Sequence, residues 1–451
     1  MARLPRLALA TLPFGPEPAP ACLAFLAAWT AQGSSAQHFR SWACPIGTAS
    51  IAAATGLPGR HLDPWLMPNE VCRAVFDRGA RHGDLAVVEG TLHDEALVAD
   101  RRQQARPGNL APIAEALELP TAAIVPCRGL SGLHLPVLPK RVEAIILDGL
   151  EDADEFPALR QVFEVLTRRP VLGALEALPD LRSSLLDLPR DQSPPAEWLS
   201  RLASSFNRFA DWNAIRELSE SRPFPESSLR YPAVGPRKFL VAYAQDEAFG
   251  GYFPDTLETL EALGADLVEF SPLRDERLPE GVDLAIIGCG FPDRHAAELS
   301  QNHSFINALR VHVCRDRRLY AEGGGLAYLG RSLILEDGKR YPAAGILPFD
   351  AELRGRPTGP TPVSRVLSRD CWLGRAGQSL RGYRCGRWRL RPAPDPLGCP
   401  GGTGVLTGSS DIYFHRQAVG SLIHLHLAAL PEVVASFASA SRGALTKQAK
   451  T

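Results

Sequence analysis

One short stretch decides the fold: Tyr320-Ala321-Glu322-Gly323-Gly324-Gly325-Leu326. It lies between an apolar run and a stretch of small residues, where a β-strand would pass into a helix through a tight glycine turn. Turns of this kind hold a nucleophilic side chain at their tip. Because the tip here is Gly323, the sequence predicts the shape of a nucleophile turn without its nucleophile.

Other short motifs fix the register of that turn. They are Asp246-Glu247-Ala248-Phe249, Glu269-Phe270-Ser271-Pro272-Leu273, Leu278-Pro279-Glu280-Gly281, Gly288-Cys289-Gly290-Phe291-Pro292, Gly338-Lys339-Arg340-Tyr341-Pro342 and His424-Leu425-His426. In this order and spacing, the second half of the chain resembles the glutaminase half of the cobyrinic acid a,c-diamide synthase family. The resemblance implies a class I glutamine amidotransferase-like domain, in which a cysteine at the position of Gly323 would attack the side-chain amide of glutamine.

The first half resembles the same family from about residue 52 to residue 175. Its motifs are Ala54-Thr55-Gly56-Leu57-Pro58, Leu62-Asp63-Pro64-Trp65, Ala74-Val75-Phe76-Asp77-Arg78-Gly79-Ala80, Asp84-Leu85-Ala86-Val87-Val88-Glu89-Gly90 and Pro170-Val171-Leu172-Gly173-Ala174. In the family this half is an ATP-dependent ligase domain. The resemblance therefore implies a P-loop, dethiobiotin-synthetase-like fold for this half, and shared ancestry across both halves.

The family's phosphate-binding loop falls on residues 10–18, with Thr11 and Gly15 inside it. Such a loop needs backbone N–H groups that cradle phosphate, a lysine and a hydroxyl. Here Glu17 occupies the lysine position and Pro18 the hydroxyl position, and prolines remove amide donors. Replacing attraction by repulsion at ~4 Å costs about a few kcal/mol at an intermediate effective dielectric. We therefore expect no cofactor in this half, neither ATP nor magnesium.

Other family positions in the first half are only partly kept. The family's aspartate after the first helix is Cys44, and the asparagine that reads a nucleobase is Asp148. Glu89 is retained at a position that resembles a magnesium-site carboxylate, although capping a helix or binding a surface partner remains an alternative role. Asp63 is a further candidate on the substrate side.

The second half keeps most of the residues that the family's thiol chemistry requires. The oxyanion turn is identified at Gly288 and Gly290, and His424 is the expected base, with His426 as the alternative two residues further on. A displaced thiol at Cys289 is conceivable, because the oxyanion turn approaches the nucleophile turn in this fold. Its angle of attack would be unplanned, so we interpret Cys289 as a small buried residue in a tight turn.

Three further features of the second half allow more than one interpretation. The pair His424 and His426 resembles a metal chelate, but no third ligand is evident, so no metal site is predicted. The glycines after Glu322 could bind an anion through backbone N–H groups. Five arginines surround Tyr383 and Trp388, and they would suit either a corrinoid precursor with many carboxylates or a solvated edge strand. They are Arg381, Arg384, Arg387, Arg389 and Arg391.

Apolar runs alternate with helical patterns along the chain, which predicts an α/β protein with a mostly parallel sheet wrapped by helices in each half. Strands are expected at 84–88, 121–125, 142–147, 238–244, 266–270, 284–288 and 318–321, and helices at 112–117, 156–166 and 255–263. A Pro- and Ser-rich linker at 222–237 separates domain 1–221 from domain 238–434, and 435–451 is expected to fray. Residues 353–404 should form an antiparallel edge or loops.

Composition excludes several classes of protein. The 451 residues carry 49 Lys and Arg against 50 Asp and Glu, so no basic field attracts nucleic acid. The nine cysteines contain no C-x-x-C pair, which favours free thiols in a reducing cytoplasm. Residues 7–12 loosely resemble a signal peptide, but prolines cut the run short, and no stretch is long enough to span a membrane. The expected location is cytoplasmic.

We interpret the sequence as a homologue of cobyrinic acid a,c-diamide synthase that lacks glutaminase and ATP-ligase activity. It would then act as a binding or regulatory protein, a pseudoenzyme with a degenerate P-loop, whose partner is a corrinoid or another polycarboxylate. The alternative is an active amidoligase that amidates tetrapyrrole carboxylates with ATP and ammonia or glutamine. A hydrolase or metal protein that reuses His424 and His426 is the least favoured hypothesis. The sequence does not indicate an oligomeric state.

Overall fold

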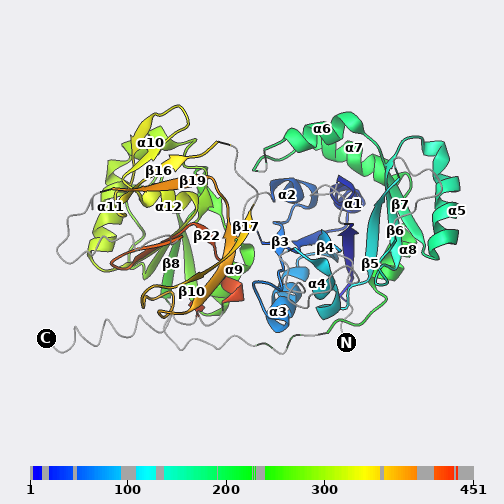
Figure 1. The fold of residues 1–451 in the computed structure, drawn as a ribbon, viewed down its shortest axis with the longest axis horizontal. Coiled ribbons are helices and arrows are strands. Elements are labelled where there is room, and N and C mark those ends of the chain that lie inside the picture. Colours follow the sequence, from blue (N-terminus) through cyan, green and yellow to red (C-terminus); the bar gives the residue numbers. More distant parts are fainter. Residues whose placement is uncertain are drawn as a thin grey trace. The chain divides into compact units, whose positions relative to one another are not determined.

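A computed structural model describes residues 4–12, 20–43, 48–92, 108–127, 137–189, 191–225, 227, 229, 239–355, 360–393, 411–430 and 433–434. The chain forms two compact units, Met1–Leu229 and Arg230–Thr451 (Figure 1). The division falls inside the predicted linker. The first residues of that linker pack on the first unit, since the buried Arg6 donates hydrogen bonds to the carbonyl oxygens of Arg222 and Pro223.

The first unit is built on a parallel sheet of seven strands in the order β3-β2-β4-β1-β5-β6-β7. The strands are β1 (Arg6–Thr11), β2 (Ala36–Arg40), β3 (Arg60–His61), β4 (Leu85–Thr91), β5 (Thr121–Pro126), β6 (Ala144–Leu150) and β7 (Val171–Glu176). The helices are α1 (Pro20–Ala31), α2 (Ala49–Thr55), α3 (Asn69–Ala80), α4 (Leu110–Ala116), α5 (Phe156–Thr167), α6 (Pro179–Asp187), α7 (Ala196–Asn207) and α8 (Trp212–Ser219). A short 3₁₀ turn, η3 (Ala153–Glu155), precedes α5.

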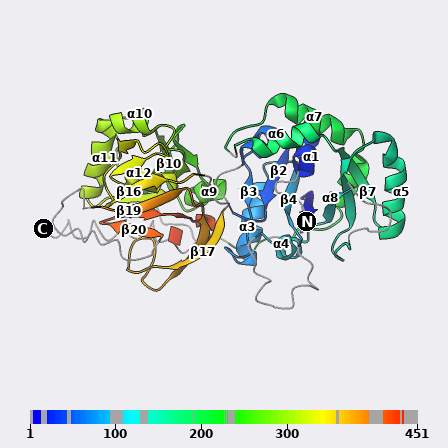
Figure 2. The same ribbon diagram turned by 45° about the horizontal axis from the view of Figure 1, so that its top comes forward.

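Helices cover both faces of this sheet: α1 and α7 lie on one face and α3 and α4 on the other (Figures 1 and 2). The core under α1 and α7 contains a cluster of aromatic rings, in which Phe25 packs against Trp29, Phe206 and Trp212. Burial of rings this large contributes much of the hydrophobic stabilisation of a domain. The segment that resembles a signal peptide forms the central strand β1, which is buried along its whole length.

The second unit has a six-stranded sheet in the order β10-β8-β11-β13-β21-β20, parallel except for the β20–β21 pair. Its strands are β8 (Phe239–Ala244), β10 (Ala265–Phe270), β11 (Leu284–Ile287), β13 (Arg318–Glu322), β20 (Ile412–His415) and β21 (Ala418–Ser421). The helices are α9 (Pro254–Ala262), α10 (Ala296–Gln301), α11 (His303–Cys314) and α12 (Gly324–Leu329), with a 3₁₀ turn η4 (Leu427–Ala429) near the end.

Three small sheets complete this unit. One pairs β9 (Phe249–Gly251) with β12 (Cys289–Gly290). The second has the order β15-β14-β16-β19 and contains β14 (Ser332–Ile334), β15 (Arg340–Pro342), β16 (Phe349–Leu353) and β19 (Trp388–Pro392). The third contains β17 (Thr361–Val366), β18 (Ser379–Arg384) and β22 (Ile423–His424), paired antiparallel in that order.

The predicted fold class is confirmed, since each unit contains a mostly parallel sheet with helices around it. All seven predicted strands and all three predicted helices form, with bounds that shift by one to a few residues. Among residues 353–404, the described parts form the antiparallel strands β17, β18 and β19. Among the described residues, no helix is both long and apolar enough to cross a membrane.

Candidate active site

The glycine turn between β13 and α12 has the predicted shape of a nucleophile turn. Gly323 adopts φ 53° and ψ −111°, a backbone conformation that residues with a side chain rarely adopt. Its N–H donates to the Ser421 carbonyl at 2.9 Å. Gly324 and Gly325 are glycines because a Cβ would stand 2.4 Å from the Gly290 oxygen and 2.2 Å from the Ile287 oxygen, respectively. The start of α12 therefore packs directly on the backbone that leads from β11 into β12.

The sulfur of Cys289 lies beside the tip of this turn and faces His424. Cys289 Sγ is 3.3 Å from His424 Nδ1 and 3.5 Å from Nε2, and the two residues are 2% and 1% exposed. Glu322 stands behind the imidazole, with Oε2 3.6 Å from Nδ1. Its Oε1 accepts hydrogen bonds from the Tyr320 hydroxyl and the Leu425 N–H. A thiol, an imidazole and an anchored carboxylate are thus brought together.

The charge state of His424 follows from this neighbourhood. Burial alone lowers the pKa of the imidazole. The charges of Cys289 and Cys385, and the hydrogen bonds from both side chains, outweigh burial and raise the pKa of His424 well above its ordinary value. The site therefore favours the protonated, imidazolium form of His424. Local motifs do not predict that Glu322 and Cys385 lie next to His424.

The alternative base, His426, lies in a different environment. Its ring stacks on Phe253 with centroids 4.5 Å apart, and Nε2 is 3.9 Å from Asp255 Oδ2. Cys289 meets His424, not His426. Within the described ranges, neither histidine belongs to a group of three residues with the spacing of a metal site.

The predicted oxyanion turn is held tightly by its neighbours. The Gly288 N–H donates to the Tyr252 hydroxyl at 3.0 Å, so in this structure it is not available to an oxyanion. A Cβ on Gly290 would stand 1.9 Å from the Ala248 oxygen, which explains why this position is glycine. Gly288 and Gly290 flank Cys289, so their close contacts fix the position of Cys289 relative to the tip of the glycine turn.

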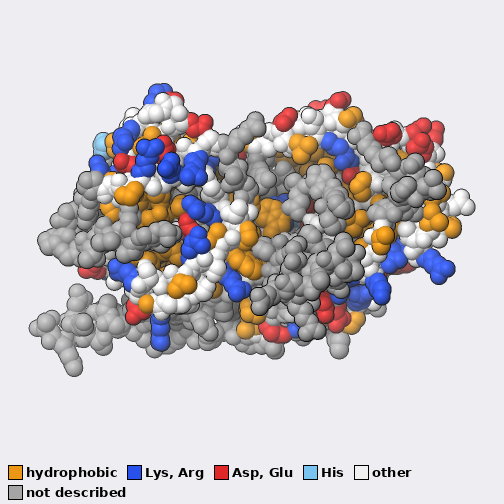
Figure 3. All heavy atoms as spheres, in the orientation of Figure 1, with side chains coloured by type: hydrophobic (Ala, Val, Ile, Leu, Met, Phe, Trp, Pro, Cys, Tyr) orange, Lys and Arg blue, Asp and Glu red, His pale blue; other side chains and the backbone are white. Residues whose placement is uncertain are grey.

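Three of the five arginines near Tyr383 and Trp388, which would suit either a ligand with many carboxylates or an edge strand, have carboxylate partners within the chain. Arg384 Nη1 is 3.1 Å from Asp411 Oδ1, and Arg387 Nη2 is 2.6 Å from Asp293 Oδ2. Arg391 similarly contacts Glu352. Basic and acidic side chains lie next to one another on the visible face of this unit (Figure 3). A ligand carboxylate would have to compete with these internal pairs.

In the first unit, Glu89 is enclosed by partners from other elements. At the end of β4 it is 4% exposed, and its Oε2 lies 2.9 Å from His38 Nε2 and 3.8 Å from Arg40 Nε. Cys22 of α1 also hydrogen-bonds Glu89. Nearby, Thr11 Oγ1 lies 3.0 Å from Thr91 Oγ1. The predicted positions Gly15, Glu17, Pro18 and Cys44 lie outside the described residues.

Cys22, His38 and Glu89 place one potential metal-ligand atom each within 4.8 Å of one another. Two features argue against a cation there. The Arg40 guanidinium already supplies a positive charge beside the carboxylate, and burial raises the pKa of the Cys22 thiol well above its ordinary value, which disfavours the thiolate ligand. Magnesium, which prefers oxygen ligands and keeps several waters, fits this enclosed mixed set poorly.

A pH dependence of stability follows from Glu89. Burial alone would raise its pKa, but the His38 hydrogen bond and the Arg40 charge lower it below the ordinary value. Because the pKa of Glu89 is lower in the folded protein than in the unfolded chain, the charged carboxylate stabilises the folded state at pH values above the unfolded pKa of about 4.3. This contribution is lost as the pH falls through the folded pKa. We expect Glu89→Gln to cost about 3 kcal/mol above about pH 5.5, and less as pH falls toward about 3.

Urea unfolding across this pH range measures the difference. The matched control is Glu197→Gln on α7, an exposed glutamate in the same unit, which should change the unfolding free energy little at any pH. A cost of Glu89→Gln that stayed constant from neutral to acidic pH would contradict the assignment of a charged, paired carboxylate.

The other two positions singled out in the first unit have structural partners. Asp63 is fully buried and accepts a hydrogen bond from the Trp65 N–H at 2.8 Å, so it shapes the turn after β3. Asp148 receives two hydrogen bonds from Arg182, at 2.6 and 3.2 Å. A carboxylate can only accept hydrogen bonds, here from the Arg182 guanidinium, whereas the asparagine of the family could also donate hydrogen bonds to a nucleobase.

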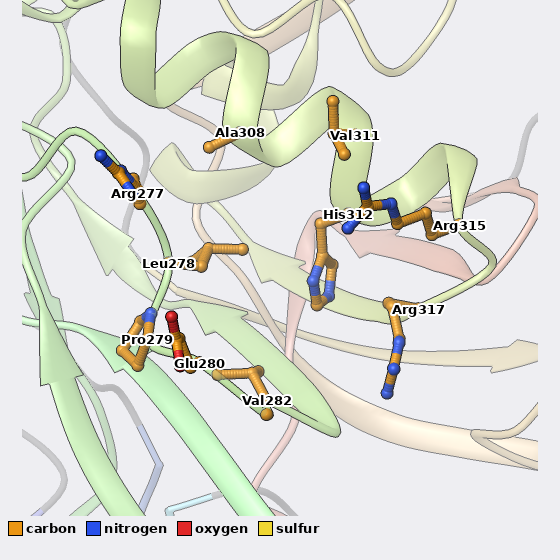
Figure 4. A pocket seen from close by; sticks show the side chains of 11 residues that line it. Arg277, Leu278, Pro279, Glu280, Val282, Ala308, Val311, His312, Arg315 and Arg317 are labelled. Carbon is orange, nitrogen blue, oxygen red and sulfur yellow. The ribbon is translucent and has the colours of Figure 1, made fainter.

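A pocket of about 350 Å³ lies in the second unit between α11 and the segment before β11 (Figure 4). Its lining includes Arg277, Arg315, Arg317 and His312. The pocket is near residues 278–282 and 317, where β11 and β13 begin, whereas the glycine turn follows the end of β13. Ligands of open α/β sheets bind outside the carboxyl ends of the strands, so this pocket lies at the wrong edge for the site at Gly323.

Comparisons with known proteins identify relatives of this chain. Residues 240–431 match the CobB/CobQ-like glutamine amidotransferase domain. A cobyrinate a,c-diamide synthase of Syntrophotalea carbinolica is 28% identical over 460 residues, which cover 97% of this chain and 99% of that protein. The enzyme of the same name from Magnetococcus marinus is 30% identical over 353 residues, 74% of each chain. A glutamine amidotransferase crystal structure aligns with 44% of this chain and 98% of its own, at 18% identity and a TM-score of 0.33.

The sequence similarity to the Syntrophotalea relative, 28% identity, extends over both units of the chain. The Syntrophotalea relative aligns over almost its full length, and the family domain lies within the second unit, where the glycine turn and His424 are found. This chain belongs to the cobyrinate a,c-diamide synthase family.

Proposed function

We propose that this chain has lost the ATP-dependent ligation of its family and acts as a binding or regulatory protein. The observation that carries the proposal is the enclosure of Glu89, whose carboxylate is already paired with His38 and Arg40 in the interior. The sequence adds Glu17 and Pro18 where a lysine and a hydroxyl are needed. Without a cationic phosphate site and a free magnesium ligand, the first unit cannot activate a carboxylate in the family manner.

The proposed ligand is a corrinoid or another small polycarboxylate. The relatives are named for cobyrinate, which makes this carboxylate the first ligand to test. Arginines are suited to bind carboxylates through paired hydrogen bonds, and Arg384 stands in β18 next to β22, which carries His424. The seven described cysteines are free thiols, which supports a reducing, cytoplasmic location within this proposal.

A second candidate function is an amidoligase that still amidates tetrapyrrole carboxylates with ATP and ammonia or glutamine. The observation that favours it is the contact between Cys289 and His424, which would be of use in releasing ammonia from glutamine. It would require a nucleotide site of a different construction from that of the family.

The two functions are separated by mixing the full chain with cobyrinate and following the corrin absorbance, first alone and then with ATP, magnesium and glutamine. We expect a saturable absorbance change and no amidated product. Arg384→Glu should weaken binding by about tenfold or more, because a charge-assisted hydrogen bond is lost and repulsion is added. Arg277→Glu, in the pocket at the opposite edge, is the matched control and should bind like the wild type. Amidated cobyrinate with concomitant ATP hydrolysis would establish the second function instead.

A further inference from the structure

The thiol missing from the tip of the glycine turn is replaced in space by the sulfur of Cys289. An ideal Cβ built on Gly323 would stand 2.7 Å from Cys289 Sγ and 2.6 Å from His424 Cε1. A cysteine side chain at position 323 would therefore point into the volume that this sulfur fills. The sulfur reaches it from the opposite side, from β12.

The surroundings accommodate the sulfur at this position. A Cβ on Gly251 of β9 would stand 2.8 Å from Cys289 Cβ, so the facing strand leaves room for the cysteine only because it carries glycine there. Two exchanges thus coincide at one point: glycine stands where the family's nucleophile belongs, and a cysteine stands in the turn that faces it. The sulfur lies next to the imidazole in this arrangement as well, but residue 289 carries it instead of residue 323.

We propose that Cys289 is a catalytic nucleophile that hydrolyses a primary carboxamide, such as the side chain of glutamine, with His424 as its proton acceptor. The reaction needs no ATP and is independent of the proposed loss of ligation in the first unit. It revises the interpretation of Cys289 as a merely small buried residue, because the sulfur meets the imidazole at 3.3 Å.

The steps balance with the groups present. His424 holds the proton of the Cys289 thiol, and the thiolate attacks the carboxamide carbon to form a carbon–sulfur bond. The carbon–nitrogen bond then breaks, and the imidazolium gives its proton to the departing nitrogen, so ammonia leaves and a thioester remains. Water, deprotonated by His424, attacks the thioester, and the carbon–sulfur bond breaks to give a carboxylic acid and the free thiol.

Glu322 is a positioning residue for this reaction. Its Oε2 is 3.6 Å from His424 Nδ1, and Cys289 Sγ lies within reach of both ring nitrogens, 3.3 Å from Nδ1 and 3.5 Å from Nε2. A carboxylate at Nδ1 favours the tautomer with the proton on that nitrogen, which leaves Nε2 to take the thiol proton. Because Oε1 is tied to Tyr320 and to the Leu425 N–H, the carboxylate has little freedom to turn away.

The thiol is 2% exposed, so a substrate must displace the segments that cover it. The rate at which a substrate-like electrophile labels Cys289 reports this opening directly. Exposed Cys314 on α11 provides an internal reference for labelling without such a barrier.

The test uses the full chain with glutamine, without nucleotide, and follows glutamate release. In parallel, a glutamine analogue with a diazoketone is incubated with the protein, and its adduct is located by mass spectrometry. We expect glutamate release from the wild type, a loss of at least about 100-fold in Cys289→Ser and Cys289→Ala, and wild-type rates in the matched control Cys314→Ser. The adduct is expected on Cys289. Glu322→Gln should shift the pH profile of the rate, which a purely structural role would not do.

Circular dichroism of each variant establishes that it is folded, and the adduct on the wild type needs no variant at all. Absence of glutamate release together with absence of an adduct on Cys289, while Cys314 reacts with iodoacetamide, would overturn the proposal. So would glutamate release that survives in both Cys289 variants. Neither result bears on the absorbance titration with cobyrinate, so failure of this inference and failure of the proposed binding function are distinguishable.

Discussion

Returning the thiol to the tip of the turn is expected to destabilise the protein unless Cys289 is removed at the same time. In Gly323→Cys, the new Cβ meets Cys289 Sγ at 2.7 Å and His424 Cε1 at 2.6 Å. Overpacking of a tight core costs about 1–3 kcal/mol, and a side chain at positive φ adds about 1 kcal/mol more. The paired variant Gly323→Cys with Cys289→Gly removes the sulfur from the contact, and most of the overpacking cost should disappear.

A double-mutant cycle of urea unfolding measures this coupling. Contacting residues give interaction free energies of about 0.5–3 kcal/mol, whereas independent sites add within about 0.5 kcal/mol. We expect a favourable coupling free energy of at least about 1 kcal/mol between the two changes. We also expect the paired variant to release glutamate and to form its adduct with the diazoketone analogue at residue 323. Strictly additive costs would mean that the two positions do not share one volume.

The second large effect is expected from Gly325→Ala. On helix propensity alone, alanine would stabilise α12 by about 1 kcal/mol. The added Cβ, however, would stand 2.2 Å from the Ile287 oxygen and 2.6 Å from the Gly288 oxygen. These are backbone atoms of β11 and its exit, which cannot rotate away, so α12 itself must move. We expect a loss of more than about 3 kcal/mol, which lies above the usual range for a single substitution.

Gly355→Ala is the matched control for this substitution. A Cβ at Gly355 meets no atom within 4 Å, and its φ is not positive, so the unfolding free energy should change by less than about 0.5 kcal/mol. Thermal and urea unfolding of the two variants side by side check the pair. Equal stability of Gly325→Ala and the wild type would show that α12 does not need glycine for its contact with β11.

The parallel strands could be predicted from the sequence, because β4, β5, β6 and β8 are nearly continuous apolar runs. By contrast, β2 could not be predicted. Its Gln37, His38 and Arg40 are buried, and a buried strand with such residues makes sense only once Glu89 is known to lie opposite. Buried polar groups become favourable through partners that are distant in the chain, and periodicity contains no information about those partners.

The candidate site shows the same limit. The glycine turn and His424 could be predicted from local motifs, as could the proximity of the turn at Cys289. The 3.3 Å contact between sulfur and imidazole could not, because it depends on how closely Gly251, Gly290 and Gly324 allow three segments to approach. Arg384 and Arg387 belong to the arginines that would suit a ligand with many carboxylates, but Asp411 and Asp293, distant in sequence, already pair with them.

We propose that the chain keeps the fold of its family and has lost the family's nucleotide-binding groups. Isothermal titration of the full chain with magnesium and a non-hydrolysable ATP analogue tests this claim most directly. We expect no saturable binding up to about 1 mM analogue, because Glu17 and Pro18 stand where the family has a lysine and a hydroxyl, and the Glu89 carboxylate is already paired with His38 and Arg40. A dissociation constant in the micromolar range, with the analogue ordered beside β1 in a co-crystal, would contradict it.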